Sequence, residues 1–165
     1  MALEIERKFL LQDESWRLQA DVGVGLRQGY LSHNEKNSIR VRIGGCRAWL
    51  NIKSSTPGTV RHEYEYPLPL AEAEEMLAGL CRSPVIEKRR YHVEYGGFTW
   101  EIDVFSGANQ GLVVAEIELE TVEQDFPRPP WLGAEVSAEL RYYNSQLVLY
   151  PYCAWSAAER QFSKA

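Results

Sequence analysis

The segment Leu3-Glu4-Ile5-Glu6-Arg7-Lys8-Phe9 has the two-residue period of a β-strand. Successive side chains of a strand point to opposite faces, so Glu4, Glu6 and Lys8 share one face while the apolar residues between them share the other. Long charged side chains at consecutive positions of one face are unusual for an ordinary solvated strand. The same arrangement recurs along the chain, and its recurrence is the main clue to fold and function.

Most of the remaining sequence has the same strand period and is broken by turn residues such as Gly44-Gly45 and Gly96-Gly97. Because several of these breaks are short enough for hairpins, we expect a largely antiparallel sheet. The expected strands are Leu3–Leu11, Gly25–Ser32, Ser38–Ile43, Ala48–Ser54, Val60–Tyr66, Ile86–Tyr95, Phe98–Phe105 and Leu112–Thr121.

One helix interrupts the strands. Between Pro69 and Leu80 the apolar residues recur at helical spacing, and acidic residues occupy the first turn, where the helix dipole favours them. Shorter helical segments are expected at Asp13–Leu18 and near Asn144–Tyr150. The proline-rich segment Phe126–Trp131 cannot be a central strand and is expected to be an extended surface connection.

The charged faces of the strands are segregated by sign, whereas a surface that serves solubility normally mixes both signs. The same-face pairs are Arg40 with Arg42, Glu63 with Glu65, Lys88 with Arg90, Glu101 with Asp103, and Glu116 with Glu118. Eight antiparallel strands are enough to close a barrel. If the apolar faces point outward, the lumen holds about six cations and about nine carboxylates. The alternative is a sheet whose charged faces are simply solvated.

A lumen of this composition has a chemical meaning. Guanidinium and ammonium groups bind phosphate oxygens, and clustered carboxylates bind hard divalent cations such as Mg²⁺. Because buried like charges do not persist unpaired, the lumen requires both a polyanion and a metal. A linear triphosphate complexed with a metal ion satisfies both requirements.

Length and composition set the remaining bounds. The 165 residues suit one domain, 1–165, and a net charge of −5 argues against broad nucleic-acid binding. We expect no membrane segment and no signal peptide, because long apolar runs are absent and charges begin at Glu4. Three cysteines without a CxxC pattern suit a reducing compartment, so we expect a cytoplasmic protein. Its assembly is left open, with a homodimer as one alternative.

In series, these motifs resemble the CYTH superfamily, the triphosphate tunnel metalloenzymes, over nearly the whole chain. The matching segments are Glu4–Lys8 (ExExK), Gln28–Leu31, Ser38–Arg42 (RxR), Glu63–Glu65, Lys88–Tyr91 (KxR), Glu116–Leu119 and Trp131–Val136. The segment Arg141–Ser145 is similar to the family's RYxNxxL element but has Tyr143 where a small residue is common. The short length is similar to the small single-domain bacterial inorganic triphosphatases.

The resemblance implies a mainly β fold of the α+β kind, a closed eight-stranded antiparallel barrel that forms a tunnel, with a few helices packed outside. It also implies Mg²⁺ or Mn²⁺ as cofactor. The phosphate-binding residues carried over are Lys8, Arg40, Arg42, Lys53, Lys88 and Arg90. The metal-binding residues carried over are Glu4, Glu6, Glu63, Glu65, Asp103, Glu116 and Glu118. The catalytic candidates are Lys8 and Tyr30, with Lys8 a phosphate ligand first and a general base second, since nearby carboxylates oppose its deprotonation.

The expected function is metal-dependent hydrolysis of inorganic triphosphate to pyrophosphate and phosphate. Hydrolysis of thiamine triphosphate or a nucleoside triphosphate, or cyclisation of ATP as in class IV adenylyl cyclases, are alternatives that need a pocket for the organic group. A non-catalytic polyphosphate-binding module is the alternative from another class. It would not need so complete a set of carboxylate pairs.

Overall fold

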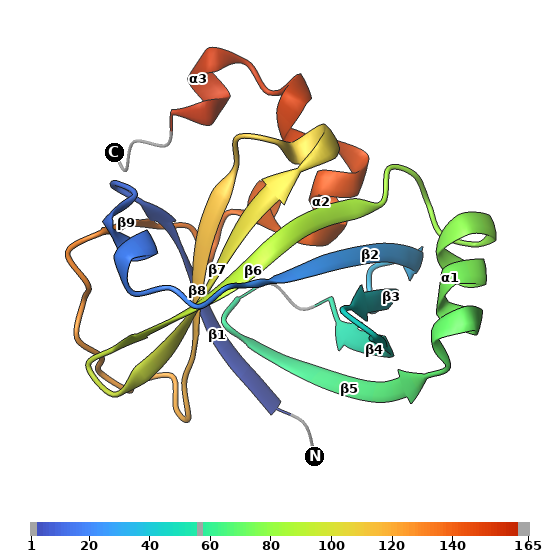
Figure 1. The fold of residues 1–165 in the computed structure, drawn as a ribbon, viewed down its shortest axis with the longest axis horizontal. Helices are drawn as coiled ribbons and strands as arrows, with labels where there is room; N and C mark the ends of the chain where they lie inside the picture. The colour runs from blue at the N-terminus through green and yellow to red at the C-terminus, as the bar shows by residue number, and fades with distance from the viewer. Residues whose placement is uncertain (1–2, 56–57, 162–165) are drawn as a thin grey trace.

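The structure is a computed structural model that describes residues 3–55 and 58–161. Eight antiparallel strands form a closed barrel, because β1 pairs with β5 as well as with β8 (Figure 1). The strands are β1 (Leu3–Leu11), β2 (Val24–His33), β3 (Asn37–Gly44), β4 (Arg47–Ser54), β5 (Val60–Leu68), β6 (Ile86–Tyr95), β7 (Phe98–Ser106) and β8 (Val113–Glu118). The expected eight-stranded barrel is therefore confirmed.

The strand ends agree with the sequence pattern to within about two residues, except at β8. This strand was expected to reach Thr121 but ends at Glu118. The backbone N–H of Leu119 still bonds to the carbonyl of Ile5, but that of Glu120 donates to the side chain of Gln124, 2.6 Å away. The chain therefore leaves the barrel through a turn that the apolar pattern does not reveal.

A ninth strand, β9 (Leu132–Glu135), pairs with β1 outside the barrel closure and was not expected as a strand. Gly133 allows this pairing, because a Cβ at that position would lie 2.8 Å from the carbonyl oxygen of Leu10. The proline-rich segment before β9 forms neither helix nor strand, but its last residue, Trp131, is buried against Trp100 rather than on the surface.

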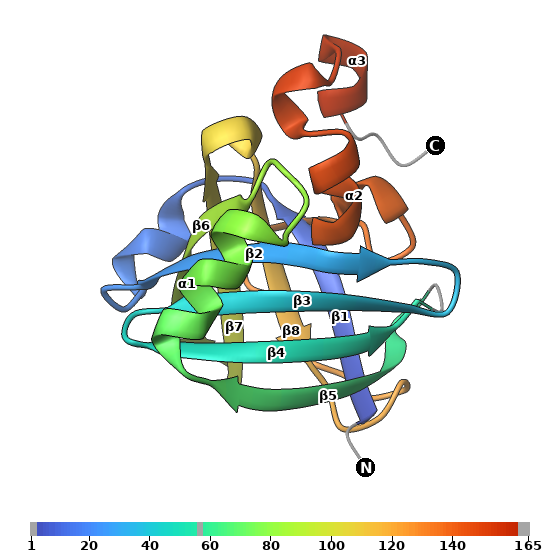
Figure 2. The same cartoon turned by 90° about the vertical axis from the view of Figure 1, so that its right-hand side faces the viewer.

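Helices cover the outside of the barrel. The main helix, α1 (Leu70–Gly79), packs Ala73 and Leu77 onto Val41 and Ile43 on the outer face of β3 (Figure 2). The shorter helical segments are η1 (Ser15–Leu18), η2 (Gly107–Asn109), η3 (Leu140–Tyr142), α2 (Asn144–Leu149), η4 (Tyr152–Ala154) and α3 (Ala157–Arg160). In the described parts of the chain, no helix is both long and apolar enough to span a membrane.

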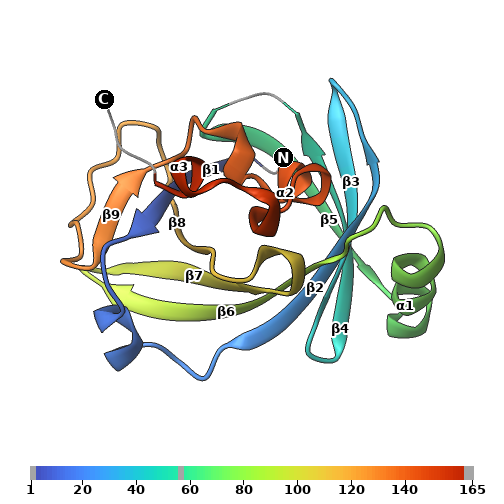
Figure 3. The ribbon, with the colours of Figure 1, turned by 90° about the horizontal axis from the view of Figure 1, so that it is seen from above.

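The C-terminal segment covers one end of the barrel (Figure 3). At this end the inward positions of the strands are apolar rather than charged. Ile86, Phe105 and Val114 pack there against Tyr142 and Leu147. These residues continue the inward faces of Lys88, Asp103 and Glu116 by the period of two. The charged part of the lumen is therefore bounded by an apolar floor.

Candidate active site

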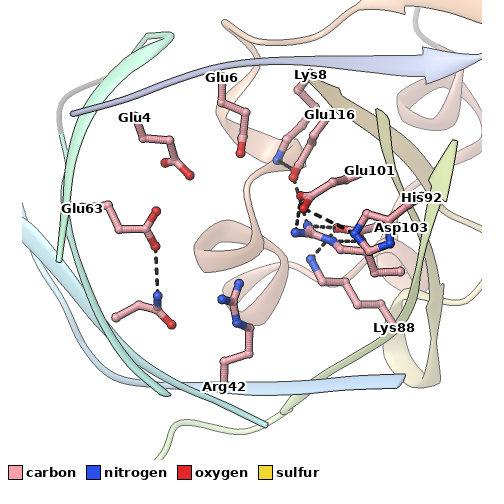
Figure 4. Close-up of polar contacts among 12 residues, drawn as sticks. Glu4, Glu6, Lys8, Arg42, Glu63, Lys88, His92, Glu101, Asp103 and Glu116 are labelled. Carbon is pink, nitrogen blue, oxygen red and sulfur yellow. Dashed lines mark hydrogen bonds and ion pairs between the residues drawn. The ribbon is translucent and has the colours of Figure 1, made fainter. Parts of the chain in front are cut away.

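The charged strand faces converge on one cavity of about 600 Å³ inside the barrel (Figure 4). Its cationic lining residues are Lys8, Arg40, Arg42, Lys53, Arg61, Lys88 and Arg90. Its acidic lining residues are Glu4, Glu6, Glu63, Glu65, Glu101, Glu116, Glu118 and Glu120. Of the side chains predicted to share the lumen, all but Asp103 line it, and Tyr30 lines it too. The charged face of each of these strands therefore points into the barrel.

Strand register sorts these charges by depth. Glu6 lies opposite Glu118, and two residues further along β1, Lys8 lies opposite Glu116. The β6–β7 turn and the loop after β8 line the cavity beside the first of these pairs, so this end is the mouth. Glu6 and Glu118 therefore lie at the mouth, and the Lys8–Glu116 pair lies deeper.

Each cation that lines the cavity is already paired with a carboxylate. Lys8 Nζ lies 2.9 Å from Glu116, and Lys53 Nζ lies 2.7 Å from Glu4 and 3.3 Å from Glu63. Further pairs are Arg40 with Glu63 at 3.7 Å, Arg42 with Glu65 at 2.8 Å, and Arg61 with Glu6 at 3.3 Å, and Lys88 and Arg90 both pair with Asp103. The cations of the cavity are therefore all engaged by carboxylates.

Asp103 is the most buried charged group of this network and lies behind the cavity wall. Its carboxylate accepts hydrogen bonds from Lys88 Nζ at 2.5 Å and from two nitrogens of Arg90 at 2.7 Å each. Burial would raise the pKa of Asp103, but Arg90 and Lys88 outweigh it and hold the pKa below the ordinary value. Both oxygens are occupied by cations, so Asp103 orients Lys88 and Arg90 toward the cavity.

The carboxylates at the mouth have raised pKa values, chiefly because they are buried. Burial and the neighbouring Glu116 raise the pKa of Glu6 to about 7. Burial likewise raises the pKa of Glu4 and, together with the surrounding carboxylates, that of Glu118. Among the described residues, no three His, Cys, Asp or Glu side chains are already gathered around a common point for a metal. Glu4 and Glu6 are instead paired with Lys53 and Arg61.

The two catalytic candidates lie in the cavity, and both are buried. Burial alone would lower the pKa of Lys8, but Glu116 and Glu6 outweigh it, so the pKa lies above its ordinary value and the ammonium stays charged. Burial also opposes the charge of Arg40, but Tyr30 and Glu63 outweigh it and raise the pKa of that guanidinium. Tyr30 lies directly opposite Arg40 in the register of β2 and β3.

Two residues of the site were missed by the sequence interpretation. Arg61 lines the cavity beside Glu6, and its parity, two residues before Glu63, is the signal that could have identified it. Asn51 is fully buried, and its side-chain nitrogen donates to Glu63 at 3.0 Å and to Glu65 at 2.6 Å. A neutral amide on a charged face did not stand out, although it holds this pair of carboxylates together.

At the rim, His92 lies between two acids. Asp21 and Glu101 lie 2.9 Å and 3.8 Å from its two ring nitrogens. Glu101 and then Asp21 raise the pKa of His92 from 6.5 to about 9. Because the folded value lies above the unfolded one, this pairing stabilises the fold fully below about pH 6.5, and its contribution disappears as the pH rises through about 9.

We therefore expect Glu101→Gln to move the pKa of His92 from about 9 toward the ordinary 6.5, measured by NMR titration of the imidazole protons. Glu94→Gln is the matched control, because Glu94 is an exposed carboxylate on β6, the strand of His92, and accepts a hydrogen bond from Thr99 instead. Titration of His92 near 6.5 in the unsubstituted protein would contradict the assignment.

Known proteins are similar to this chain in both sequence and structure. Residues 2–148 match the CYTH domain family. An inorganic triphosphatase from Acetivibrio thermocellus is 46% identical over 152 residues, which cover 92% of this chain and 97% of the relative. An inorganic triphosphatase from Nitrosomonas europaea is 37% identical over 151 residues, covering 88% and 97%. The crystal structure of an inorganic triphosphatase superposes with a TM-score of 0.63 at 34% identity, covering 90% of this chain and 96% of the other.

Proposed function

The chain belongs to the CYTH family, and from this premise we propose that it is a metal-dependent hydrolase of inorganic triphosphate. Water cleaves a terminal phosphoanhydride bond, and the products are pyrophosphate and phosphate. Both full-length relatives named above are inorganic triphosphatases, and this chain spans nearly all of their length.

The observation that carries the proposal is the complete pairing of the cavity cations with carboxylates. A bare polyanion that binds the cations would leave the carboxylates unpaired in a buried space, which is costly. A metal ion that arrives with the polyanion gives the carboxylates a new partner at the same time. The cavity is therefore suited to a polyphosphate–metal complex rather than to either component alone.

The donor set at the mouth fits a hard divalent cation. Glu4, Glu6 and Glu118 supply only oxygen donors, and burial, which raises the pKa of each, opposes the ionised form unless a cation lies beside it. Glu63, Glu65 and Glu116 join them once their own cationic partners turn to phosphate. We propose Mg²⁺ or Mn²⁺. Such an ion supplies Lewis-acid polarisation of phosphoryl oxygens and neutralises their charge.

The chain's own residues bind and orient the substrate. Lys88 and Arg90, held by Asp103, present fixed donors from β6, and Arg40, paired with Glu63, presents another from β3. Because such donors are preorganised, they stabilise the charge that develops during phosphoryl transfer without reorganising at that moment. Lys8 remains protonated beside Glu116, so we assign it to phosphate binding rather than to the role of general base. Because Lys88 and Arg90 occupy both oxygens of Asp103, we assign Asp103 to holding these cations rather than to binding the metal.

The substrate prediction follows from the number of donors. We expect kcat/KM to be highest for inorganic triphosphate, lower for ATP and near zero for pyrophosphate. Three phosphates engage the cations of the cavity without any contact to an organic group. Pyrophosphate is too short to reach them all, so several cations stay paired with their carboxylates. Phosphate release from inorganic triphosphate, thiamine triphosphate, ATP and pyrophosphate, with Mg²⁺ and with Mn²⁺, measures this order.

ATP as the best substrate, with cyclic AMP accumulating, would overturn the triphosphatase assignment in favour of a cyclase. Binding of triphosphate without turnover under any metal would favour the polyphosphate-binding module.

The proposal includes a cytoplasmic location, in keeping with the free thiols of Cys46, Cys81 and Cys153. Light scattering on the purified chain distinguishes a monomer from a homodimer.

A further inference from the structure

A second cavity of about 360 Å³ adjoins the active-site cavity. Five residues line both, and they form the boundary between the two spaces. These shared residues are Ser38, Lys53, Arg61, Tyr143 and Ser145. Among them, Tyr143 has the only aromatic ring, and it occupies the position at which the sequence departs from the family element. The smaller cavity is called the side cavity below.

Tyr143 is held in place from three directions. Its ring centroid lies 5.3 Å from Lys8 Nζ and 5.0 Å from the guanidinium carbon of Arg61, so the ring contacts two cations of the active site. Its hydroxyl donates to the backbone carbonyl of Ser137 at 2.7 Å. Its backbone N–H donates to Leu140, and its own carbonyl accepts from the first turn of α2. The ring is therefore a fixed part of the boundary rather than a mobile surface group.

Charge decides where a longer phosphate chain can extend. Toward the mouth it meets Glu101, Glu118 and Glu120, which repel it. Toward the side cavity it meets Lys53 and Arg61, which line both spaces and attract phosphate. The side cavity adds one acid, Glu35. The favourable direction for a fourth phosphate is therefore past Tyr143.

We propose that Tyr143 is a specificity-determining residue that limits the bound phosphate chain to three units by closing the active site against the side cavity. The inference rests on the proposed function, since it names the chain length that the same site selects. Removal of the ring joins the two cavities along a wall that already carries Lys53 and Arg61. A linear tetraphosphate then gains contacts that triphosphate does not reach.

The experiment compares inorganic triphosphate with inorganic tetraphosphate in the parent protein and in the variants Tyr143→Ala, Tyr143→Ser and Tyr143→Phe. Calorimetry with Ca²⁺ as the accompanying cation gives the two Kd values, with phosphate release under the same conditions to verify that no turnover occurs, and phosphate release with Mg²⁺ gives the two kcat/KM values. We expect Tyr143→Ala and Tyr143→Ser to shift the ratio of Kd values toward tetraphosphate by about tenfold or more, the scale of one added charge-assisted contact. Tyr143→Phe keeps the ring and the parent ratio.

Tyr150→Ala is the matched control, because Tyr150 is an exposed tyrosine of the same segment that lines neither cavity. A ratio that stays within twofold of the parent in both small-residue variants overturns the inference, as does an equal shift in Tyr143→Phe. Failure of the proposed function looks different. In that case the parent releases no phosphate from triphosphate, while the ratio of Kd values still decides whether Tyr143 limits chain length.

Discussion

Replacement of Asp103 by asparagine is expected to lower the free energy of unfolding by about 3–5 kcal/mol, the usual cost of removing one partner from a buried ion pair. Asp103 is completely buried and is the shared acceptor for Lys88 and Arg90. Without its charge, Lys88 has no other carboxylate within ion-pairing distance among the described residues, whereas Arg90 keeps Glu116 and Glu101. Urea unfolding followed by circular dichroism measures the loss.

Lys88→Met in the Asp103→Asn background is the control that separates charge from packing. If the cost arises from the stranded ammonium, the double variant recovers stability relative to Asp103→Asn, with a coupling of about 0.5–3 kcal/mol. Burial and Arg90 already lower the pKa of Lys88 to about 8, which shows how strongly its charge depends on Asp103. Equal stability of Asp103→Asn and the parent protein would mean that the charge of Asp103 does not stabilise the buried ion pairs with Lys88 and Arg90.

The barrel could be predicted because the period of two is a local property. Arg40 with Arg42 and Lys88 with Arg90 needed only their spacing to share a face. The inward direction of these faces followed from their segregation by sign, and all four residues line one cavity. The depth of each residue needed the pairing of β1 with β8, which no single strand contains.

The features that the sequence did not reveal depend on contacts between neighbouring side chains or strands rather than on a period within one strand. Asn51 bridges Glu63 and Glu65 on the adjacent strand, and a lone amide gives no periodic signal. Asp103 has the parity of a lumen residue but lies behind Lys88 and Arg90, because two long cationic side chains cover one short acid. The strand β9 was hidden because Gly133 serves close backbone approach rather than a strand preference.

Removal of divalent cations is expected to reduce triphosphate hydrolysis by at least about 1,000-fold, since metal Lewis acidity is worth several kcal/mol in a transition state. Glu4, Glu6 and Glu118 give the reason in this chain. A polyanion that takes Lys53 from Glu4 and Arg61 from Glu6 leaves two buried carboxylates without a cation, and Glu118 makes no ion pair of its own among the described residues. Phosphate release measured in excess chelator, and again after Mg²⁺ or Mn²⁺ is restored, tests the dependence. Full turnover in chelator would give the carboxylates another purpose.

Glu118→Gln connects this dependence to the mouth. Glu118 makes no ion pair within 4.0 Å among the described residues, so its neutralisation leaves the cation network intact while it removes one metal donor. We expect the Mg²⁺ concentration for half-maximal activity to rise at least about tenfold, with little change in the melting temperature. Glu75→Gln, at an exposed carboxylate on α1, leaves both unchanged. If Glu118→Gln lowered activity at saturating metal without changing the metal requirement, Glu118 would act on the substrate rather than through the cation, and the cation would have to be held by Glu4 and Glu6 without it.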